Sequence, residues 1–417
     1  MIGRRSKTRG GVIAALDIGS SKVCCFVARM SGDTINVIGI GHQVAKGLRG
    51  GSVVDMEAAE AAILNAVSAA EQMAGETLRS VIVSLSAGQL ASHTTAVDVE
   101  IAGHEVGDTD LRRVIDHGRQ HNQRPERELI HAIPVAYTID GSRGIRDPRG
   151  MFGTRLGVNM HMITAAPAAL RNLATCIGRC HLSVDGFVVS PYAAGLAVLV
   201  EDEMDLGATV IDMGGGTTSI AVFFDGNVIH VDGVPVGGNH ITNDIARGLS
   251  TPVAHAERMK TLYGSAIASP ADEREVIDVP LVGEEDGTQP NHIPKSILVG
   301  IIRPRLEEIF EMVRARLEAS GVDKIAGRRV VLTGGGSQLQ GVRELAGLIL
   351  DKQVRLGRPI RVAGLADSTG GPAFAVCAGL LQYPLQRHAE AARQAAYRDG
   401  DRGGLFGRFG LWLREVF

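Results

Sequence analysis

The sequence predicts an α/β fold of two domains that share a duplicated core, with a smaller module inserted in each half. The main observation is a repeat. An apolar run that ends in an aspartate and a tight turn occurs as DIGSSK at Asp17–Lys22 and as DMGGGTT at Asp212–Thr218. Around each turn, strand-like runs form a hairpin and alternate with segments of helical spacing. With 417 residues, 45% of them apolar, the chain can form two to three domains with a large core.

The first half begins with strand-like runs at Val12–Asp17, Val23–Met30 and Thr34–Gly41. Asp55–Ala74 then has helical spacing and is followed by a glycine, which is typical of a helix end. Its expected inner face consists of Met56, Ala59, Ile63, Ala66, Val67, Ala70 and Met73. Val81–Leu85 is typical of a buried strand.

Residues 86–164 interrupt this order and predict a separate module inserted in the first domain. Its predicted elements are a strand at Thr94–Ile101, a polar helix at Asp108–His121, a strand at His131–Asp140 and a turn-rich stretch at Gly141–Gly153. Helical spacing returns at Ala166–Ile177.

The second half repeats the strand, turn and hairpin. The predicted strands are Thr209–Met213, Ile220–Phe224 and Asn227–Val231, with the hairpin turn at Asp225 and Gly226. A second module covers residues 242–320. Its predicted elements are helices near Ile241–Leu249 and Ala254–Tyr263, strands at Glu275–Val282 and Ser296–Ile301, and an amphipathic helix at Arg303–Ser320 with Leu306, Ile309, Phe310, Val313 and Leu317 inward. Arg329–Leu332 is a further strand.

Composition argues against several classes of function. A formal net charge of −3 with 21% charged residues argues against a nucleic-acid binder. The cysteines form no CxxC pair, which is typical of buried thiols in a reducing compartment. We find no metal-spaced His/Cys cluster and no GxSxG motif, and we predict no catalytic nucleophile. Without a signal peptide or a run of about 18 apolar residues, any membrane contact is expected to be peripheral.

The two aspartate turns share one chemical logic. Glycines and small hydroxyl residues let backbone N–H groups approach phosphate oxygens, and two such turns can face each other around one triphosphate. The carboxylates of Asp17 and Asp212 can hold Mg²⁺ through its waters, and Lys22 adds a point charge. A third turn, TGGGSQL at Thr333–Leu339, follows a strand and suits close approach to a nucleotide. A single turn of this kind is more often structural, so the combination carries the prediction.

These motifs, in this order, resemble those of the superfamily of actin, heat-shock chaperones and sugar kinases. Longer stretches are similar to the FtsA family of bacterial cell-division proteins, namely KGLRGGSVVDMEAAEAAILNAVSAAEQMAG (Lys46–Gly75), IPVAYTIDGSRGIRDPRGM (Ile133–Met151) and TRLGVNMHMITA (Thr154–Ala165). The last two match the inserted subdomain 1C that separates this family from ordinary actins. The resemblance covers about residues 12–383 and the last helix, and it implies an actin-like fold.

The resemblance also implies a division of the chain. The expected parts are a flexible basic N-terminus at 1–11, subdomain 1A at 12–85 and 165–205, 1C at 86–164, 2A at 206–241 and 321–383, 2B at 242–320, a linker at 384–403 and a membrane-targeting amphipathic helix at 404–417.

ATP and Mg²⁺ are the cofactors that the resemblance implies. The matching nucleotide-binding residues are Asp17, Gly19, Ser20, Ser21, Lys22, Asp212, Gly214, Gly215, Gly216, Thr217, Thr218, Glu257, Lys260, Gly334, Gly335, Gly336 and Ser337. Asp17 and Asp212 are the expected Mg²⁺ residues. Arg305 and Glu308 match positions that help to bind the C-terminal tail of the tubulin-like partner FtsZ, although an ordinary charged helix face also fits them.

The chain departs from the superfamily at one position. Chaperones and bacterial actins carry a Glu before the Pro of an E-P-x-A stretch, where it helps to position the attacking water. Here VVSPYAAG places Ser190 at that point. Because a serine hydroxyl cannot act as a carboxylate base, we expect ATP binding with at most slow hydrolysis.

The last residues predict an amphipathic helix that lies in a membrane surface. Its apolar face consists of Leu405, Phe406, Phe409, Trp412, Leu413, Val416 and Phe417. Arg408, Arg414 and Glu415 fall on the other side, while Leu411 breaks the pattern. The segment is too short to span a bilayer, and its aromatic and arginine side chains suit an anionic lipid surface.

The resemblance, together with the amphipathic C-terminal segment, implies a peripheral protein of the bacterial division septum, at the cytoplasmic face of the inner membrane. We expect it to tether FtsZ filaments, to polymerise with itself and to recruit later division proteins through subdomain 1C. Two alternatives on the same fold stay open. A sugar or carboxylate kinase needs a substrate base and no membrane tail, and a pilus-assembly actin relative shares the insertion but typically lacks the tail.

Overall fold

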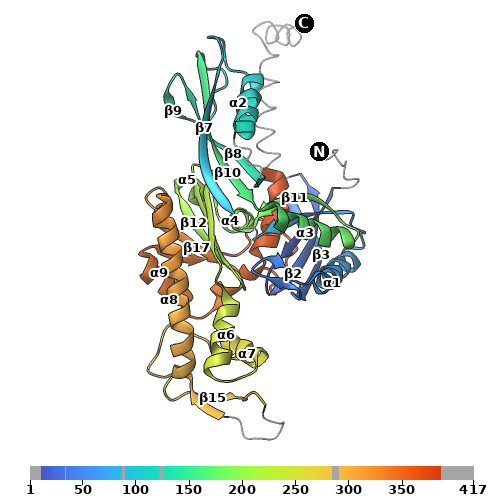
Figure 1. Ribbon diagram of the computed structural model, residues 1–417, viewed down its shortest axis with the longest axis vertical. Coiled ribbons are helices and arrows are strands. Elements are labelled where there is room, and N and C mark those ends of the chain that lie inside the picture. Colours follow the sequence, from blue (N-terminus) through green and yellow to red (C-terminus); the bar gives the residue numbers. More distant parts are fainter. Residues whose placement is uncertain (1–10, 33, 87–89, 122–125, 284–290, 387–417) are drawn as a thin grey trace, which may run out of the picture.

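The computed structural model describes residues 11–32, 34–86, 90–121, 126–283 and 291–386. Figure 1 shows an elongated molecule whose two central sheets, one from each half of the chain, lie between two peripheral modules. The module of the first half lies at one end, around α2, and the module of the second half lies at the other, around α6 and α7.

The first central sheet has the strand order β11-β6-β1-β2-β3. Its strands are β1 (Val12–Ile18), β2 (Lys22–Ser31), β3 (Thr34–Val44), β6 (Ser80–Leu85) and β11 (Ser183–Val189). β1 pairs antiparallel with β2 and parallel with β6. One face of this sheet packs on α1 (Met56–Ala74) and α3 (Pro167–Arg179), and the small hairpin β4 (Leu48–Arg49) and β5 (Ser52–Val53) precedes α1.

The second central sheet repeats this topology, with the order β18-β17-β12-β13-β14. Its strands are β12 (Ala208–Met213), β13 (Thr218–Phe224), β14 (Asn227–Val234), β17 (Arg329–Thr333) and β18 (Gln353–Leu356). β12 pairs antiparallel with β13 and parallel with β17, as β1 does with β2 and β6. The hairpin turns at Asp225 and Gly226, whose φ angles of 54° and 75° are typical of a type I′ turn. The predicted duplicated core is therefore confirmed.

Two helices lie between the central sheets and join them into one core. They are α4 (Ser190–Val198) and the helical residues 375–386. Both pack with Phe26 of the first sheet and Phe223 of the second in one buried cluster. The helices touch at backbone distance, because a Cβ on Gly379 would lie 1.7 Å from the carbonyl oxygen of Ala193.

The inserted module of the first half is a sheet in the order β7-β10-β8-β9, with α2 (Asp108–His121) packed on it. Its strands are β7 (Ala91–Glu100), β8 (Glu128–Ile139), β9 (Ser142–Ile145) and β10 (Arg155–Ala165). The module of the second half contains α6 (Gly238–Gly248), α7 (Val253–Tyr263), β15 (Val276–Val279), β16 (Asn291–Pro294) and α8 (Lys295–Ser320). The remaining elements are α5 (Glu201–Leu206), η1 (Gly335–Gln338), α9 (Val342–Leu350) and η2 (Pro372–Phe374).

Three predictions about elements were wrong. Ser296–Ile301 is not a strand but the beginning of α8, where Leu298 and Val299 are buried on the same face as Leu306. The strand expected at Glu275–Val282 is limited to β15. Met73 was expected on the inner face of α1 but is 61% exposed, because Ala74 is the residue that packs against Gly39 of β3 at this end of the helix.

Candidate functional site

The two aspartate turns have the same local geometry. In the first turn, the N–H of Gly19 donates to the carbonyl oxygen of Lys22 at 3.0 Å. In the second, the N–H of Gly214 donates to the carbonyl oxygen of Thr217 at 2.9 Å. Each turn thus reverses the chain from the strand that carries the aspartate into the next strand of its hairpin.

The two turns also touch each other. The Ser21 hydroxyl donates to Oδ1 of Asn239 at 2.9 Å, and Asn239 lies at the start of α6 in the second domain. A Cβ on Gly215 would lie 1.9 Å from Oγ of Ser21, and one on Gly216 would lie 2.5 Å from Oγ of Ser20. Glycine is therefore required on the second turn by the approach of the first.

A cavity of about 510 Å³ opens between the two turns. The predicted residues that line it are Asp17, Gly19, Ser20, Ser21, Lys22, Asp212, Gly214, Gly215, Gly216, Thr217, Glu257, Lys260, Gly334, Gly335 and Gly336. The structure thus brings together residues that are more than 300 positions apart in the sequence. This volume suits a ligand of nucleotide size.

Two of the predicted residues do not line the cavity. The Thr218 hydroxyl donates to the carbonyl oxygen of Val236 at 2.8 Å, and the Ser337 hydroxyl donates to that of Gly334 at 2.8 Å. Both side chains are fully buried. Their hydroxyls therefore brace the turns from behind instead of facing a ligand.

The carboxylates of Asp17 and Asp212 dominate the electrostatics of the cavity. Each residue is 8% exposed, and the Ser84 hydroxyl donates to Oδ1 of Asp17 at 2.8 Å. Burial raises the pKa of Asp17. Burial, followed by the nearby charge of Asp17, raises the pKa of Asp212 to about 7, while Lys22 opposes both shifts. Such a pair fits a hard divalent cation such as Mg²⁺, which would hold both groups ionised. Within the described residues no cluster of three or more potential ligands forms a protein-only metal site.

Lys22 is held by a segment that the sequence analysis did not single out. Its ammonium lies 3.4 Å from the ring centroid of Phe374 and donates to the carbonyl oxygen of Ala373. Pro372 and Ala373 line the same cavity. The signal in the sequence is the Gly-Gly-Pro run before an apolar helix, which is typical of a tight approach to that helix.

The third turn forms part of the cavity wall beside Asp212. Gly334 has a φ of 84°, and a Cβ there would lie 2.3 Å from Oδ1 of Asp212. Its N–H donates to the carbonyl oxygen of Pro372 at 3.1 Å. Backbone freedom and close packing therefore both require glycine at this position.

Residues of α7 form another part of the cavity wall. Nζ of Lys260 lies 2.6 Å from Oε2 of Glu257 and 2.8 Å from Oγ1 of Thr242, so α7 is fixed to α6. Leu262 and Leu339 supply apolar surface beside this pair. A polar pair next to apolar walls suits a ribose and a flat base.

Ser190 also lines the cavity. It is the first residue of α4, is 2% exposed, and its hydroxyl has no hydrogen-bond partner among the described residues. A buried hydroxyl without a partner in a polar cavity is typical of a position that binds water or a ligand.

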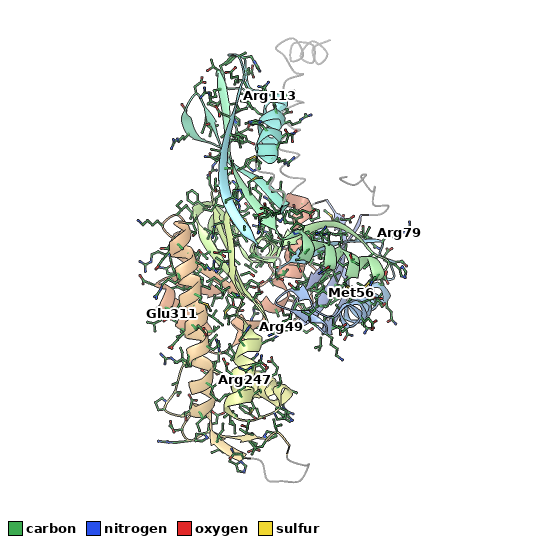
Figure 2. The ribbon with its side chains drawn as sticks, viewed as in Figure 1. Arg49, Met56, Arg79, Arg113, Arg247 and Glu311 are labelled. Carbon is green, nitrogen blue, oxygen red and sulfur yellow. The ribbon has the colours of Figure 1, made fainter. Side chains whose placement is uncertain are left out.

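Arg305 and Glu308 lie away from this cavity on α8. The Arg305 guanidinium forms two bonds with the carboxylate of Asp244 on α6, at 2.6 and 3.1 Å, and also pairs with Glu308. In Figure 2 the two helices can be found by the labelled residues Arg247, near the end of α6, and Glu311, on α8.

The predicted membrane residues Leu405, Phe406, Phe409, Trp412, Leu413, Val416 and Phe417 lie outside the described residues. In the part of the chain that is described, no helix has the length and apolar character needed to cross a bilayer.

Comparison with known proteins points to one family. A model of the cell division protein FtsA matches residues 209–379, and a model of the SHS2 domain inserted in FtsA matches residues 87–164. The cell division protein FtsA of Rhizobium meliloti (strain 1021) is 46% identical over 424 residues, which cover 98% of this chain and 96% of that protein. The cell division protein FtsA of Escherichia coli (strain K12) is 32% identical over 415 residues, which cover 97% and 98%.

Solved structures share the fold at lower identity. The PilM–PilN type IV pilus biogenesis complex superposes with a TM-score of 0.62 at 19% identity, over 89% of this chain and 98% of that chain. MreB5 of Spiroplasma citri bound to ADP superposes with a TM-score of 0.53 at 15% identity, over 92% and 99%. These similarities concern the actin-like fold alone.

Proposed function

Because the chain belongs to the FtsA family of cell division proteins, we propose that it is an ATP-dependent membrane scaffold of the bacterial divisome. It binds ATP with Mg²⁺ between its two domains and polymerises with itself. It tethers filaments of the tubulin-like protein FtsZ to the cytoplasmic face of the inner membrane. It also recruits later division proteins through the inserted module.

One observation carries the nucleotide part of this proposal. Two turns of the same geometry, one from each repeat, meet across one cavity and bring Asp17 and Asp212 to it. Backbone N–H groups on glycine-rich turns cradle phosphates, and Mg²⁺ offsets the paired carboxylates. When bound, Mg²⁺ neutralises phosphate charge; the chain's own part is to orient the nucleotide with Lys22, the turn amides and the α6–α7 wall. The fold relative MreB5, which is described as bound to ADP, supports this use of the cavity.

The membrane part rests on the pattern of the last residues. Their apolar face and their arginines support a reversible contact with anionic lipid. The FtsZ-binding part rests on the match at Arg305 and Glu308, for which the module of the second half is the proposed site. In the structure both side chains take part in ion pairs, and Glu308 is half exposed.

The two alternative functions fit less well. A sugar or carboxylate kinase needs a base beside its acceptor, whereas the first residue of α4 in this cavity is Ser190, whose hydroxyl cannot act as a carboxylate base. A pilus-assembly role is suggested by a fold similarity at 19% identity, whereas the FtsA of Rhizobium meliloti is 46% identical over 98% of this chain.

Co-sedimentation with vesicles of anionic phospholipid tests the proposal as a whole. We expect the chain to pellet with vesicles, to pellet more in the presence of Mg²⁺ and ATP because assembly multiplies weak contacts, and to carry a labelled FtsZ tail peptide with it. Vesicles of neutral lipid are the matched control. A chain that pellets without lipid dependence, or that leaves the peptide in the supernatant, would contradict the scaffold function.

A further inference from the structure

The Lys22 ammonium contacts an aromatic ring and a backbone carbonyl oxygen at the edge of the cavity. Its ammonium lies 3.4 Å from the ring centroid of Phe374, well within the range of a cation–π contact. It also donates to the carbonyl oxygen of Ala373. An ammonium has three N–H donors, so this arrangement leaves donors for an anion in the cavity.

The Phe374 ring is itself held in place from behind. It stacks on Phe26, with ring centroids 6.0 Å apart and an angle of 15° between the rings. His42 meets it edge-on at 5.9 Å. Phe26 is fully buried between the two sheets. The surface on which the ammonium rests is therefore fixed by the core and not by a mobile side chain.

The same short segment contacts the third turn. The carbonyl oxygen of Pro372 accepts from the N–H of Gly334 at 3.1 Å and from the hydroxyl of Thr333 at 3.2 Å. Lys22 also lines the same cavity as Asp17 and Asp212, and its positive charge opposes the burial that raises their pKa values. The segment thus fixes Lys22 relative to both the carboxylates and the third turn.

We propose that Phe374 is a positioning residue for phosphate binding. Its ring holds the Lys22 ammonium where the charged part of a nucleoside di- or triphosphate binds, an inference that rests on the proposed nucleotide function. A free lysine side chain must lose rotamer freedom when it binds phosphate, whereas a lysine already held on a ring has lost it in advance.

The test compares ligands that differ only in phosphate. Titrations with Mg²⁺ and ATP, with Mg²⁺ and ADP, and with adenosine are made on the wild type, Phe374→Leu and Phe374→Tyr. Because Leu fills the space without a π face, we expect Phe374→Leu to weaken ATP and ADP binding on the order of fivefold and to leave adenosine unchanged. Phe374→Tyr keeps the ring and is expected to bind like the wild type.

A second background separates positioning from packing. In Lys22→Met, the substitution Phe374→Leu should have no further effect on ATP affinity, because the group that the ring positions is gone. If Phe374→Leu does not fold, replacing Phe374 by 3,4,5-trifluorophenylalanine keeps the shape of the ring and weakens its negative face, and the same loss of ATP affinity is expected.

Three results would overturn the inference. They are an equal loss for adenosine, a loss that persists in the Lys22→Met background, and wild-type ATP affinity in both Phe374→Leu and the trifluorophenylalanine variant. A wild type that binds none of the three ligands would instead overturn the nucleotide function itself, and the inference with it.

Discussion

Asp17 and Asp212 occupy positions where a carboxylate is unstable without a cation. Each is 8% exposed and both line the same cavity. The pKa of Asp212 is raised from 3.8 to about 7, so between these values the folded chain holds a proton that the unfolded chain releases. The free energy of unfolding therefore falls as pH rises from about 4 to 7. The total loss, reached above pH 7, is on the order of 4 kcal/mol.

Asp212→Asn is therefore expected to have opposite effects on stability and binding. Without ligand it should raise the melting temperature by several degrees at pH 8, where Asp212 is charged, and by much less at pH 5, where Asp212 is protonated. It should also weaken Mg²⁺-dependent ATP binding at least about tenfold, because an amide replaces a charged oxygen ligand. Thermal denaturation at both pH values and ATP titrations with and without Mg²⁺ check this. Equal stabilisation at both pH values would show that charge is not the cause.

Ser190 determines the expected rate of hydrolysis. Its buried hydroxyl lines the cavity but cannot take a proton from water as a carboxylate can. We expect turnover far below the enzyme median of about 10 s⁻¹. Ser190→Glu is expected to raise the turnover, and Ser190→Ala to leave it low, in a phosphate-release assay at saturating ATP. A wild-type rate near the median would contradict this reading.

At the scale of single residues, the sequence predicted the glycines and aspartates of the turns because turn chemistry is local. It could not predict Phe374, since the contact between Lys22 and this segment joins positions about 350 residues apart. The family resemblance assigned Thr218 and Ser337 to the nucleotide site. A hydroxyl in a turn can face either way, however, and here both donate to backbone carbonyl oxygens.

Among the elements, α8 shows why a strand was predicted where a helix forms. Ser296–Ile301 is an apolar run of strand length, and Pro304 favours a helix start nearby. The helix instead begins at Lys295, whose ammonium pairs with Glu275 at 2.9 Å and Asp272 at 3.5 Å. Burial of Leu298 and Ile302 in the core cluster of the second half outweighs the hydrogen bond lost at Pro304.

The ion pair between Arg305 and Asp244 fixes α8 to α6. The two side chains are 27% and 25% exposed and share two hydrogen bonds. Arg305→Glu should lower the stability of the chain by about 1–3 kcal/mol, because two carboxylates then face each other. The exchanged pair Arg305→Asp with Asp244→Arg should recover most of this loss, as measured by chemical denaturation.

This ion pair changes how peptide binding is tested. A loss of FtsZ-tail affinity in Arg305→Glu alone is ambiguous, since it also disturbs α6. The exchanged pair restores the contact between the helices but moves the positive charge to α6. If Arg305 binds the tail directly, the exchanged pair should stay weak in peptide titrations while its stability recovers. Wild-type peptide affinity in both variants would mean that the FtsZ tail binds at another site.

The inserted module is attached to β14 of the second domain by a buried network. Nδ1 of His161 lies 2.8 Å from the carbonyl oxygen of Val228, so this nitrogen carries the proton. The Ser92 hydroxyl then donates to Nε2 of His161 at 2.6 Å and accepts from the N–H of Val231 at 3.1 Å. The network requires a neutral imidazole.

Because the network needs a neutral His161, we expect the chain to lose stability in acid. Burial, with smaller effects of His230 and His93, lowers its pKa from 6.5 to about 4. Neutral His161 contributes fully to the free energy of unfolding above pH 6.5. This contribution is lost as pH falls to about 4, a change on the order of 3 kcal/mol. His161→Gln should flatten the dependence of unfolding free energy on pH in this window. An unchanged pH dependence in denaturant titrations would assign the acid sensitivity to other groups.

At the scale of the whole molecule, the sequence predicted two related halves because the repeat of strand, turn and hairpin can be read locally. How the halves share one core could not be predicted. Residues 375–386 are apolar on nearly every side, so no amphipathic pattern shows which domain they join. In the structure they pack between the sheets of both domains. This helix is also the last described segment before the polar residues that lead to the C-terminal tail.

The last prediction concerns that tail, which we expect to act as the membrane anchor. Its last twelve residues hold four of the sixteen aromatic residues of the chain, including the single Trp. A short amphipathic segment binds lipid weakly, and assembly of many copies strengthens the binding. Trp412→Glu places a charge on the apolar face and should lower the affinity for anionic vesicles at least about tenfold. Trp412→Phe keeps an aromatic ring and should bind these vesicles like the wild type. ATP affinity should be the same in both variants, because the cavity lies within the actin-like domains. If residues 1–403 alone pellet with vesicles as well as the complete sequence does, the tail is not the anchor.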